Sequence, residues 1–144
     1  EDRLRAGAEL LLLSGGLRRL SSGRLLMINH YKFSHRIDLD DIMRQGNVKR
    51  WKGRSHLTAM LSEDDGATWP YTLLLDERDE VSYPDAKEAD DGYIYVTYDH
   101  QRVTKREILM ARFTEQDILS GRLQSSRSAL RILVNKALGQ PNIH

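Results

Sequence analysis

The sequence predicts an all-β protein built from antiparallel hairpins. Short apolar runs, several of them alternating with polar residues, recur along the chain and are separated by turn-forming residues. Helix-length apolar periodicity is almost absent. One polar turn, residues 62–69, carries the side chains that a tight hairpin needs. Together these observations favour about eight or nine short strands over any helical architecture.

The turn Ser62-Glu63-Asp64-Asp65-Gly66-Ala67-Thr68-Trp69 lies between two strand-like runs. Gly66 can adopt the positive φ that tight turns often require. The short side chains of Ser62, Asp64 and Thr68 can bond nearby backbone N–H groups and close the turn. Trp69 ends the segment with a large ring that favours burial. The rest of the chain is organised around this turn.

Before this turn, the sequence predicts three strands and one long loop. Ala8–Ser14 fits a buried strand or a short helix, since a short apolar run does not decide between them. Leu17–Leu20 and Arg24–Tyr31 form a hairpin through a glycine-containing turn. Residues 32–53 read as a loop that could hold one helical turn at Asp38–Met43.

Two strands flank the organising turn. Ser55–Leu61 alternates, with Leu57, Ala59 and Leu61 on one face. Tyr71–Asp76 is the expected return strand.

Three more strands follow. Val81–Ala86 is interrupted by Pro84, which suits an edge or irregular position. After the turn at residues 90–92, Tyr93–Tyr98 is rich in β-branched and aromatic residues. Residues 99–106 are expected to be a loop, and Glu107–Phe113 the next strand.

A short helix is predicted near the C-terminus. Thr114 and Asp117 form a variant of the capping box, and Gly121 is positioned to end the helical turn. The last apolar run, residues 130–134, favours a strand, although a helix through Leu138 stays open. The strands then divide into two four-stranded units, about 17–76 and 82–134.

Composition excludes several classes of function. The chain has 144 residues, a net charge of +1 and no cysteine, so disulfide and thiolate chemistry are excluded. Basic residues outnumber acidic ones in residues 1–60 and 101–144, and the reverse holds in residues 61–100. Such blocks are either solvated faces or walls of an anion-binding cleft. The basic residues form no stripe with interleaved aromatic residues, so a nucleic-acid partner is not expected.

No membrane partner, metal or cofactor is expected. The longest apolar run, Leu10-Leu11-Leu12-Leu13, is too short to span a membrane or to act as a secretory signal, so we expect a soluble protein of unassigned compartment. The five histidines show no zinc-ligand spacing. Asp64-Asp65-Gly66 resembles the start of a calcium loop without its later ligands.

The chain resembles a known propeller family over Leu17–Leu119. Its Ser-x-Asp-x-Gly-x-Thr-Trp pattern resembles the Asp-box of bacterial sialidase-like (BNR-repeat) proteins. Further pieces are similar to the C-terminal part of that family, namely Arg24–His30, Arg54–Ser62, Ser82–Asp85 and Asp91–Tyr98. The resemblance implies two to three four-stranded antiparallel blades of a six-bladed β-propeller. At roughly 40–50 residues per blade, residues 1–144 supply one partial propeller domain.

The resemblance also implies candidate site residues. Sialidase-type sites bind an acidic sugar through arginines and use a tyrosine nucleophile. Tyr83 is the candidate nucleophile, and Asp85 could tune its proton. Arg54 and Arg102 are candidates for binding the sugar carboxylate, with Asp99 beside Arg102. His100 could join Asp99 in orienting the arginines, and Asn29 and His30 end a strand at the same rim.

Each of these candidates has a plainer interpretation. Tyr83 could be a packed core tyrosine, and Arg54 and Arg102 could be solvated loop arginines. The Asp-box residues Ser62, Asp64, Gly66, Thr68 and Trp69 have a structural meaning in either case.

The function that the resemblance implies is a sialidase-like glycoside hydrolase segment, which hydrolyses terminal bonds of anionic, or else uncharged, sugars when the propeller is complete. The alternatives are a non-catalytic carbohydrate- or protein-binding segment and a remnant without activity. Enzymatic activity of this chain alone stays undecided, since the family's acid/base aspartate and first arginines lie in earlier blades. We expect exposed blade edges to cause self-association, aggregation or a rearranged packing.

Overall fold

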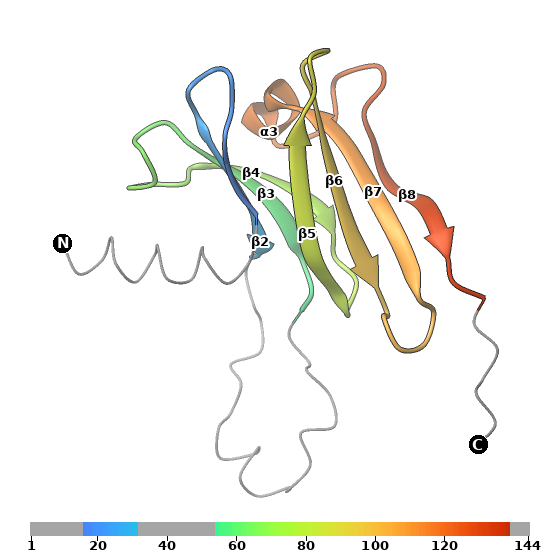
Figure 1. The fold of residues 1–144 in the computed structure, drawn as a ribbon. Helices are drawn as coiled ribbons and strands as arrows, with labels where there is room; N and C mark the ends of the chain where they lie inside the picture. Colours follow the sequence, from blue (N-terminus) through green and yellow to red (C-terminus); the bar gives the residue numbers. More distant parts are fainter. Residues whose placement is uncertain (1–15, 32–53, 139–144) are drawn as a thin grey trace, which may run out of the picture.

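Two four-stranded antiparallel sheets make up the protein (Figure 1). The computed structural model describes residues 16–31 and 54–138. The first sheet has the order β1-β2-β3-β4 and the second β5-β6-β7-β8, so within each sheet every strand pairs with its neighbour in sequence. The strands are β1 (Leu17–Arg19), β2 (Leu25–His30), β3 (Leu57–Ser62), β4 (Tyr71–Asp76), β5 (Val81–Glu88), β6 (Tyr93–His100), β7 (Glu107–Thr114) and β8 (Ala129–Lys136).

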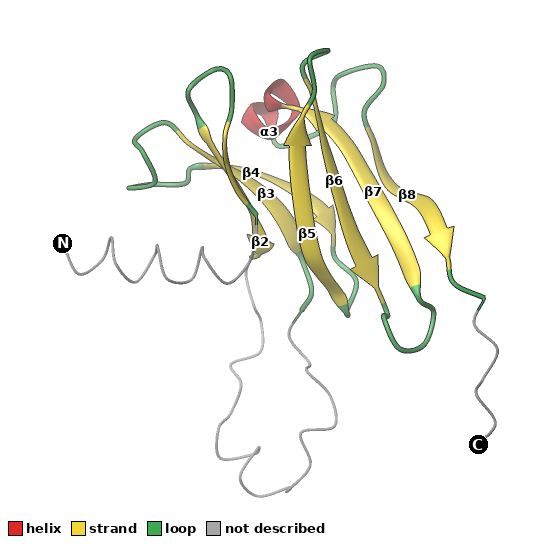
Figure 2. Ribbon diagram, in the orientation of Figure 1, coloured by secondary structure: helices red, strands yellow, loops and turns green. Residues whose placement is uncertain are grey.

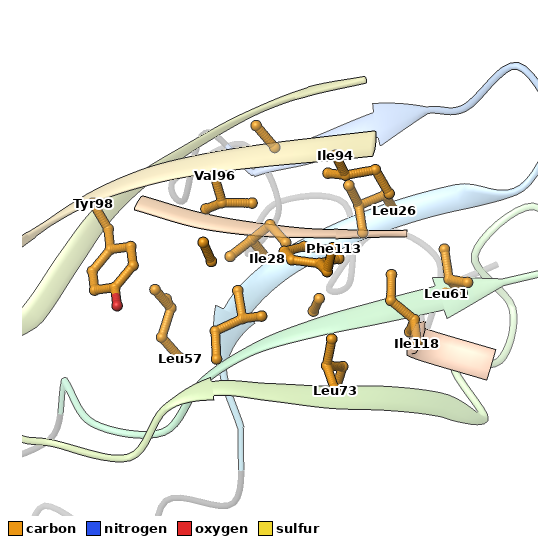
Figure 3. Close-up of a cluster of buried hydrophobic side chains, with 14 of the residues drawn as sticks. Leu26, Ile28, Leu57, Leu61, Leu73, Ile94, Val96, Tyr98, Phe113 and Ile118 are labelled. Atoms are coloured by element: carbon orange, nitrogen blue, oxygen red, sulfur yellow. The ribbon is translucent and has the colours of Figure 1, made fainter. Parts of the chain in front are cut away.

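The sheets pack face to face around one apolar core (Figure 3). The alternation that the sequence predicts in β3 sends Leu57, Ala59 and Leu61 into this core. Ile94 and Val96 from β6 meet them from the second sheet. All five side chains are fully buried. Because each sheet buries its apolar face against the other, neither four-stranded unit is expected to be stable alone.

One short helix covers one end of the space between the sheets (Figure 2). This helix, α3 (Glu115–Ser120), starts at the predicted capping box. Thr114 Oγ1 accepts from the Asp117 N–H, and the Asp117 carboxylate accepts from the Thr114 N–H. Gly121 ends the helix at φ 69°, as predicted. Ile118 is fully buried and joins the core, so the helix closes that end of the packing.

The turn at residues 62–69 is closed by its own side chains. Asp64 accepts from the Thr68 N–H at 2.8 Å, from the Thr68 hydroxyl at 2.6 Å and from the Ser62 hydroxyl at 2.7 Å. Ser62 Oγ in turn accepts from the Gly66 N–H at 2.8 Å. Gly66 has φ 89°, the conformation predicted for it. Trp69 is half-buried and lies beside Gly66.

The prediction of an all-β protein with two four-stranded antiparallel sheets is confirmed. Pro84 does lie on an edge strand, at an irregular stretch of β5. The last apolar run is the strand β8 rather than a helix. The expected loop at residues 99–106 was wrong at its start, because Asp99 and His100 continue the ladder of β6 opposite Ile108 and Glu107.

Some expectations lie outside the described residues. These are the element at Ala8–Ser14 and the loop at residues 32–53 with its possible helical turn. Within the described ranges, no helix is long and apolar enough to cross a membrane.

We predict that Asp64→Ala destabilises the fold in a pH-dependent manner. Hydrogen bonds from Thr68 and then Ser62 lower the pKa of Asp64 to about 2, against about 3.9 in an unfolded chain. A lowered folded-state pKa stabilises the protein above the unfolded value, and this contribution disappears as the pH falls from about 4 to about 2. Thermal melts should therefore show a lower Tm for the variant at pH 7, by roughly a few degrees.

The Tm difference between wild type and Asp64→Ala should shrink on acidification towards pH 2. Asp90→Ala, in the exposed turn between β5 and β6, is the control. A difference that stays constant from pH 7 to pH 2 would show that the Asp64 carboxylate does not hold the turn.

Candidate functional site

Three segments distant in sequence meet at the end of the sheets opposite α3 (Figure 1). They are the end of β2, the residues just before β3, and the start of β5. The Val81 N–H donates to the Arg54 carbonyl at 3.0 Å, and the Tyr31 N–H donates to the His56 carbonyl at 3.1 Å. His30 Nε2 lies 2.6 Å from the Val81 carbonyl oxygen. These bonds fix Arg54, from the first sheet, beside the strand that carries Tyr83.

Tyr83 lies at an irregularity of β5. The register of β5 on β6 shifts between Ser82 and Asp85, and Tyr83 has φ 51°. A positive φ at a bulky residue is a strained conformation that the surroundings must stabilise. The neighbours Ser82 and Pro84 are buried, while Tyr83 is 61% exposed. The irregularity therefore directs the phenol ring out of the sheet, and Tyr83 is not the core tyrosine of the plainer interpretation.

Two arginines flank the ring of Tyr83. The guanidinium carbon of Arg102 lies 4.6 Å from the ring centroid, and that of Arg54 lies 5.3 Å from it. Both distances are within the range of cation–π attraction. Hydrogen bonding and charge from Arg54, followed by the charge of Arg102, lower the pKa of Tyr83. The structure thus brings together three of the predicted residues, from three different segments.

Asp99 approaches the same group from β6. Its side chain is 10% exposed, and its Oδ2 atom lies 3.6 Å from Arg102 Nε. Its other oxygen, Oδ1, accepts a hydrogen bond from the Ser82 hydroxyl. Ser82 was not among the predicted site residues, because nothing in the sequence indicates that β5 and β6 pair these two positions.

The remaining predicted residues lie less directly at the site. His30 is next to β5, and burial, opposed by its bond to the Val81 carbonyl, lowers its pKa. The Asn29 carboxamide accepts from the His30 N–H at 2.8 Å. Asp85 pairs with Arg18 at 3.0 Å. His100 is buried and contacts Glu107 at 2.8 Å through its Nδ1 atom.

A second polar cluster, not predicted from the sequence, joins the two sheets. Asp76, fully buried at the end of β4, accepts from the Tyr98 hydroxyl at 2.8 Å. The guanidinium of Arg78 donates to both Asp76 oxygens, at 2.9 and 2.7 Å. Burial raises the pKa of Asp76, but the bonds from Arg78 outweigh it and the net shift is downward. Arg131 from β8 lies 3.7 Å from the same carboxylate.

The two clusters suit different tasks. In the second cluster each charged side chain pairs with another protein group, so the cluster stabilises the fold. At Tyr83 the phenol is open to solvent and two guanidinium groups lie against it. Such a group favours an anionic ligand and the anionic form of the phenol. Among the described residues, no group of three or more acidic or histidine side chains is placed to hold a metal ion.

The comparison with protein families gives one match. A family described as BNR repeat-like domain matches residues 14–96, more than half of the chain. The matched segment includes the Asp-box turn, Arg54 and Tyr83, and it ends before Asp99 and Arg102. Neither a curated protein nor a solved structure matches the chain significantly.

We predict that Tyr83→Gly is more stable than Tyr83→Ala. Both variants remove the ring and its contacts with the arginines, so they differ mainly in the cost of the left-handed backbone. Glycine adopts φ near 51° without that cost, which is about 1 kcal/mol for alanine. Urea unfolding should therefore show a higher midpoint for Tyr83→Gly.

The matched control is the same pair of substitutions at Tyr95, in the regular ladder of β6. At Tyr95 the glycine variant should be less stable than the alanine variant. If the glycine variant is the less stable one at Tyr83 as well, the left-handed conformation of Tyr83 is contradicted.

Proposed function

Because the chain belongs to the BNR repeat-like domain family, which is found in sialidase-type propellers, we propose that it is the segment of a sialidase-like glycoside hydrolase that binds an acidic terminal sugar. The observation that carries the proposal is the placement of Arg54 and Arg102 against the exposed ring of Tyr83. The substrate class is a glycoside whose terminal sugar bears a carboxylate.

The arginines suit the carboxylate of such a sugar. A guanidinium offers two parallel N–H donors that match the two oxygens of a carboxylate, and lysine lacks this geometry. Arg102 is more than half exposed, so its donors remain accessible to a ligand. Asp99 offsets only part of the positive charge.

Tyr83 suits the role of nucleophile. A neutral phenol is not repelled by the carboxylate of the substrate, as an aspartate or glutamate would be. The arginines lower its pKa and so stabilise the charge that develops when its proton leaves. In the step, the phenolic proton passes to water, the phenol oxygen bonds to the anomeric carbon, and the glycosidic C–O bond breaks. Water or an acid from another part of the propeller supplies the proton for the leaving group.

One observation favours a second candidate function. Within residues 16–31 and 54–138, the side chains that shift the pKa of Tyr83 are Arg54 and Arg102, and an arginine is no base for its proton. A non-catalytic segment that binds an acidic carbohydrate or protein would need only the arginines and the ring.

We also propose that copies of the chain associate through open strand edges and that the associated copies share the site. The outer edge strand of the second sheet, β8, has Leu133 and Val134 at 55% exposure each. Leu74 on β4, an edge strand of the first sheet, is 45% exposed. Apolar residues on open strand edges favour association.

For the catalytic role we predict that Tyr83→Phe abolishes turnover of a fluorogenic aryl sialoside. Removing a nucleophile typically lowers kcat by roughly a thousandfold or more. Tyr93→Phe is the matched control, because Arg127 lies 4.9 Å from the ring of Tyr93 and this pair lies at the α3 end of β6. Tyr93→Phe should retain turnover. If Tyr83→Phe hydrolyses the sialoside as fast as wild type, Tyr83 is not the nucleophile.

For the assembly we predict that turnover occurs only in a defined oligomer. Light scattering on size-exclusion fractions, with turnover measured on each fraction, tests this directly. The substitutions Leu133→Lys and Val134→Lys in β8 should each shift the solution mass towards that of the monomer, since charges oppose edge pairing. Turnover should fall in parallel with the mass. Turnover in a monomeric fraction would show that no second copy is needed.

A further inference from the structure

A chain of polar contacts leads from the interior of the second sheet to the ring of Tyr83. The Ser82 hydroxyl donates to Asp99 Oδ1, and Asp99 Oδ2 pairs with Arg102 Nε at 3.6 Å. The guanidinium of Arg102 lies 4.6 Å from the Tyr83 ring centroid. Ser82 and Tyr83 are consecutive in β5, so the contacts form a closed loop around the irregular stretch of that strand.

We propose that Asp99, fixed by Ser82, is a positioning residue that holds Arg102 over Tyr83 and thereby makes Tyr83 a modification site for electrophiles that react with phenolates. The inference rests on the proposed function, in that it concerns the same tyrosine. It goes further by assigning roles to Ser82 and Asp99 and a class of reagent to Tyr83.

Burial indicates that Asp99 is the fixed partner of its ion pair. Its side chain is 10% exposed, whereas that of Arg102 is 67% exposed. A long exposed arginine samples many rotamers unless a fixed group limits them. Asp99 has two such constraints, its place in the β6 ladder and the bond from Ser82. Arg102 follows β6 in the turn at residues 101–106, where Gln101 has φ 48°.

Other charges near Tyr83 do not provide this constraint. Arg54 reaches the ring from the first sheet at 5.3 Å. His30, at the end of β2, faces the Val81 carbonyl, and its pKa is lowered, chiefly by burial. Asp85, two residues further along β5, pairs with Arg18. Within residues 16–31 and 54–138, the ion-pair partner of Arg102 is Asp99.

The direction of the effect distinguishes positioning from simple electrostatics. The negative charge of Asp99 by itself disfavours a phenolate nearby, so removing it should make Tyr83 easier to ionise. If Asp99 holds Arg102 in place, removing it also releases the cation, and Tyr83 becomes harder to ionise. Asp99→Ala therefore gives opposite results under the two accounts.

An aryl sulfonyl fluoride is a suitable probe of the phenolate. The phenolic proton passes to water, and the phenolate oxygen attacks the sulfonyl sulfur. An S–O bond forms, the S–F bond breaks and fluoride leaves, so the step needs no oxidant or further reagent. The rate follows the phenolate fraction of each tyrosine, and mass spectrometry of peptides locates the label.

The experiment labels the full chain with the sulfonyl fluoride from pH 7 to pH 10. Tyr83 should react faster than Tyr93, which has one arginine against its ring instead of two. Asp99→Ala should slow labelling of Tyr83 by roughly a few fold at pH 7 and shift its pH profile upward. Arg54, the larger cause of the lowered pKa of Tyr83, stays in place, so only the contribution of Arg102 is lost.

Ser82→Ala changes no charge. It should also shift the pH profile of Tyr83 labelling upward, by less than Asp99→Ala does. Its matched control is Ser21→Ala. Ser21 also donates its hydroxyl to a carboxylate, Glu88 Oε1 at 2.7 Å, at the opposite end of β5. That variant should leave labelling of Tyr83 unchanged. Asp99→Glu, which keeps the charge, should restore part of the rate if it can still reach Arg102.

Two results would overturn the inference. One is faster labelling of Tyr83 in Asp99→Ala, which simple electrostatics predicts. The other is an unchanged pH profile in Asp99→Ala and Ser82→Ala, with folding verified by circular dichroism. Neither readout requires sialoside turnover. Slower labelling in a chain that hydrolyses no glycoside would support the inference and count against the proposed function.

Discussion

The face-to-face packing of the two sheets is the interaction on which the rest of the structure depends. Leu57 and Leu61 from the first sheet and Ile94 and Val96 from the second are fully buried against one another. Apolar burial of this kind contributes about 1.5–3 kcal/mol for each large side chain. Arg54 precedes the first sheet's β3, whereas Tyr83 lies on β5 of the second sheet and Arg102 in the turn after β6. The candidate site therefore exists only while the sheets are packed.

Polar contacts define the end of that packing. Asp76 is fully buried at the end of β4, yet it is bonded to Tyr98 on β6 and to Arg78. A buried carboxylate is costly unless its oxygens are satisfied. The contacts with Tyr98 hold the sheets in one relative position at the end where Arg54 meets β5. The structural polar groups and the candidate site thus share one rim and have separate partners.

The features that sequence predicted well are local ones. The turn at Asp64, the cap at Thr114 and the alternation of Leu57, Ala59 and Leu61 each depend on residues within a few positions of one another. Such patterns are visible in a single chain segment because turn chemistry and side-chain period are properties of that segment.

The features that were missed depend on pairing between segments. The bond from Ser82 to Asp99 and the left-handed backbone of Tyr83 follow from a shift in the β5–β6 register. The contact between Asp76 and Tyr98 follows from the sheet packing. Arg54, Tyr83 and Arg102 were named as candidates through family resemblance, but their distances from one another could not be derived from the sequence. Catalysis by this group stays a proposal.

Binding of an acidic sugar tests the central claim most directly. Calorimetric titration of the full chain with a free sialic acid analogue, and with its methyl ester, separates the carboxylate from the rest of the sugar. If Arg54 and Arg102 bind the carboxylate, the free acid binds and the ester binds at least roughly tenfold more weakly. The double variant Arg54→Ala, Arg102→Ala should then bind acid and ester with equal affinity. Equal affinity for acid and ester would contradict a carboxylate site beside Tyr83.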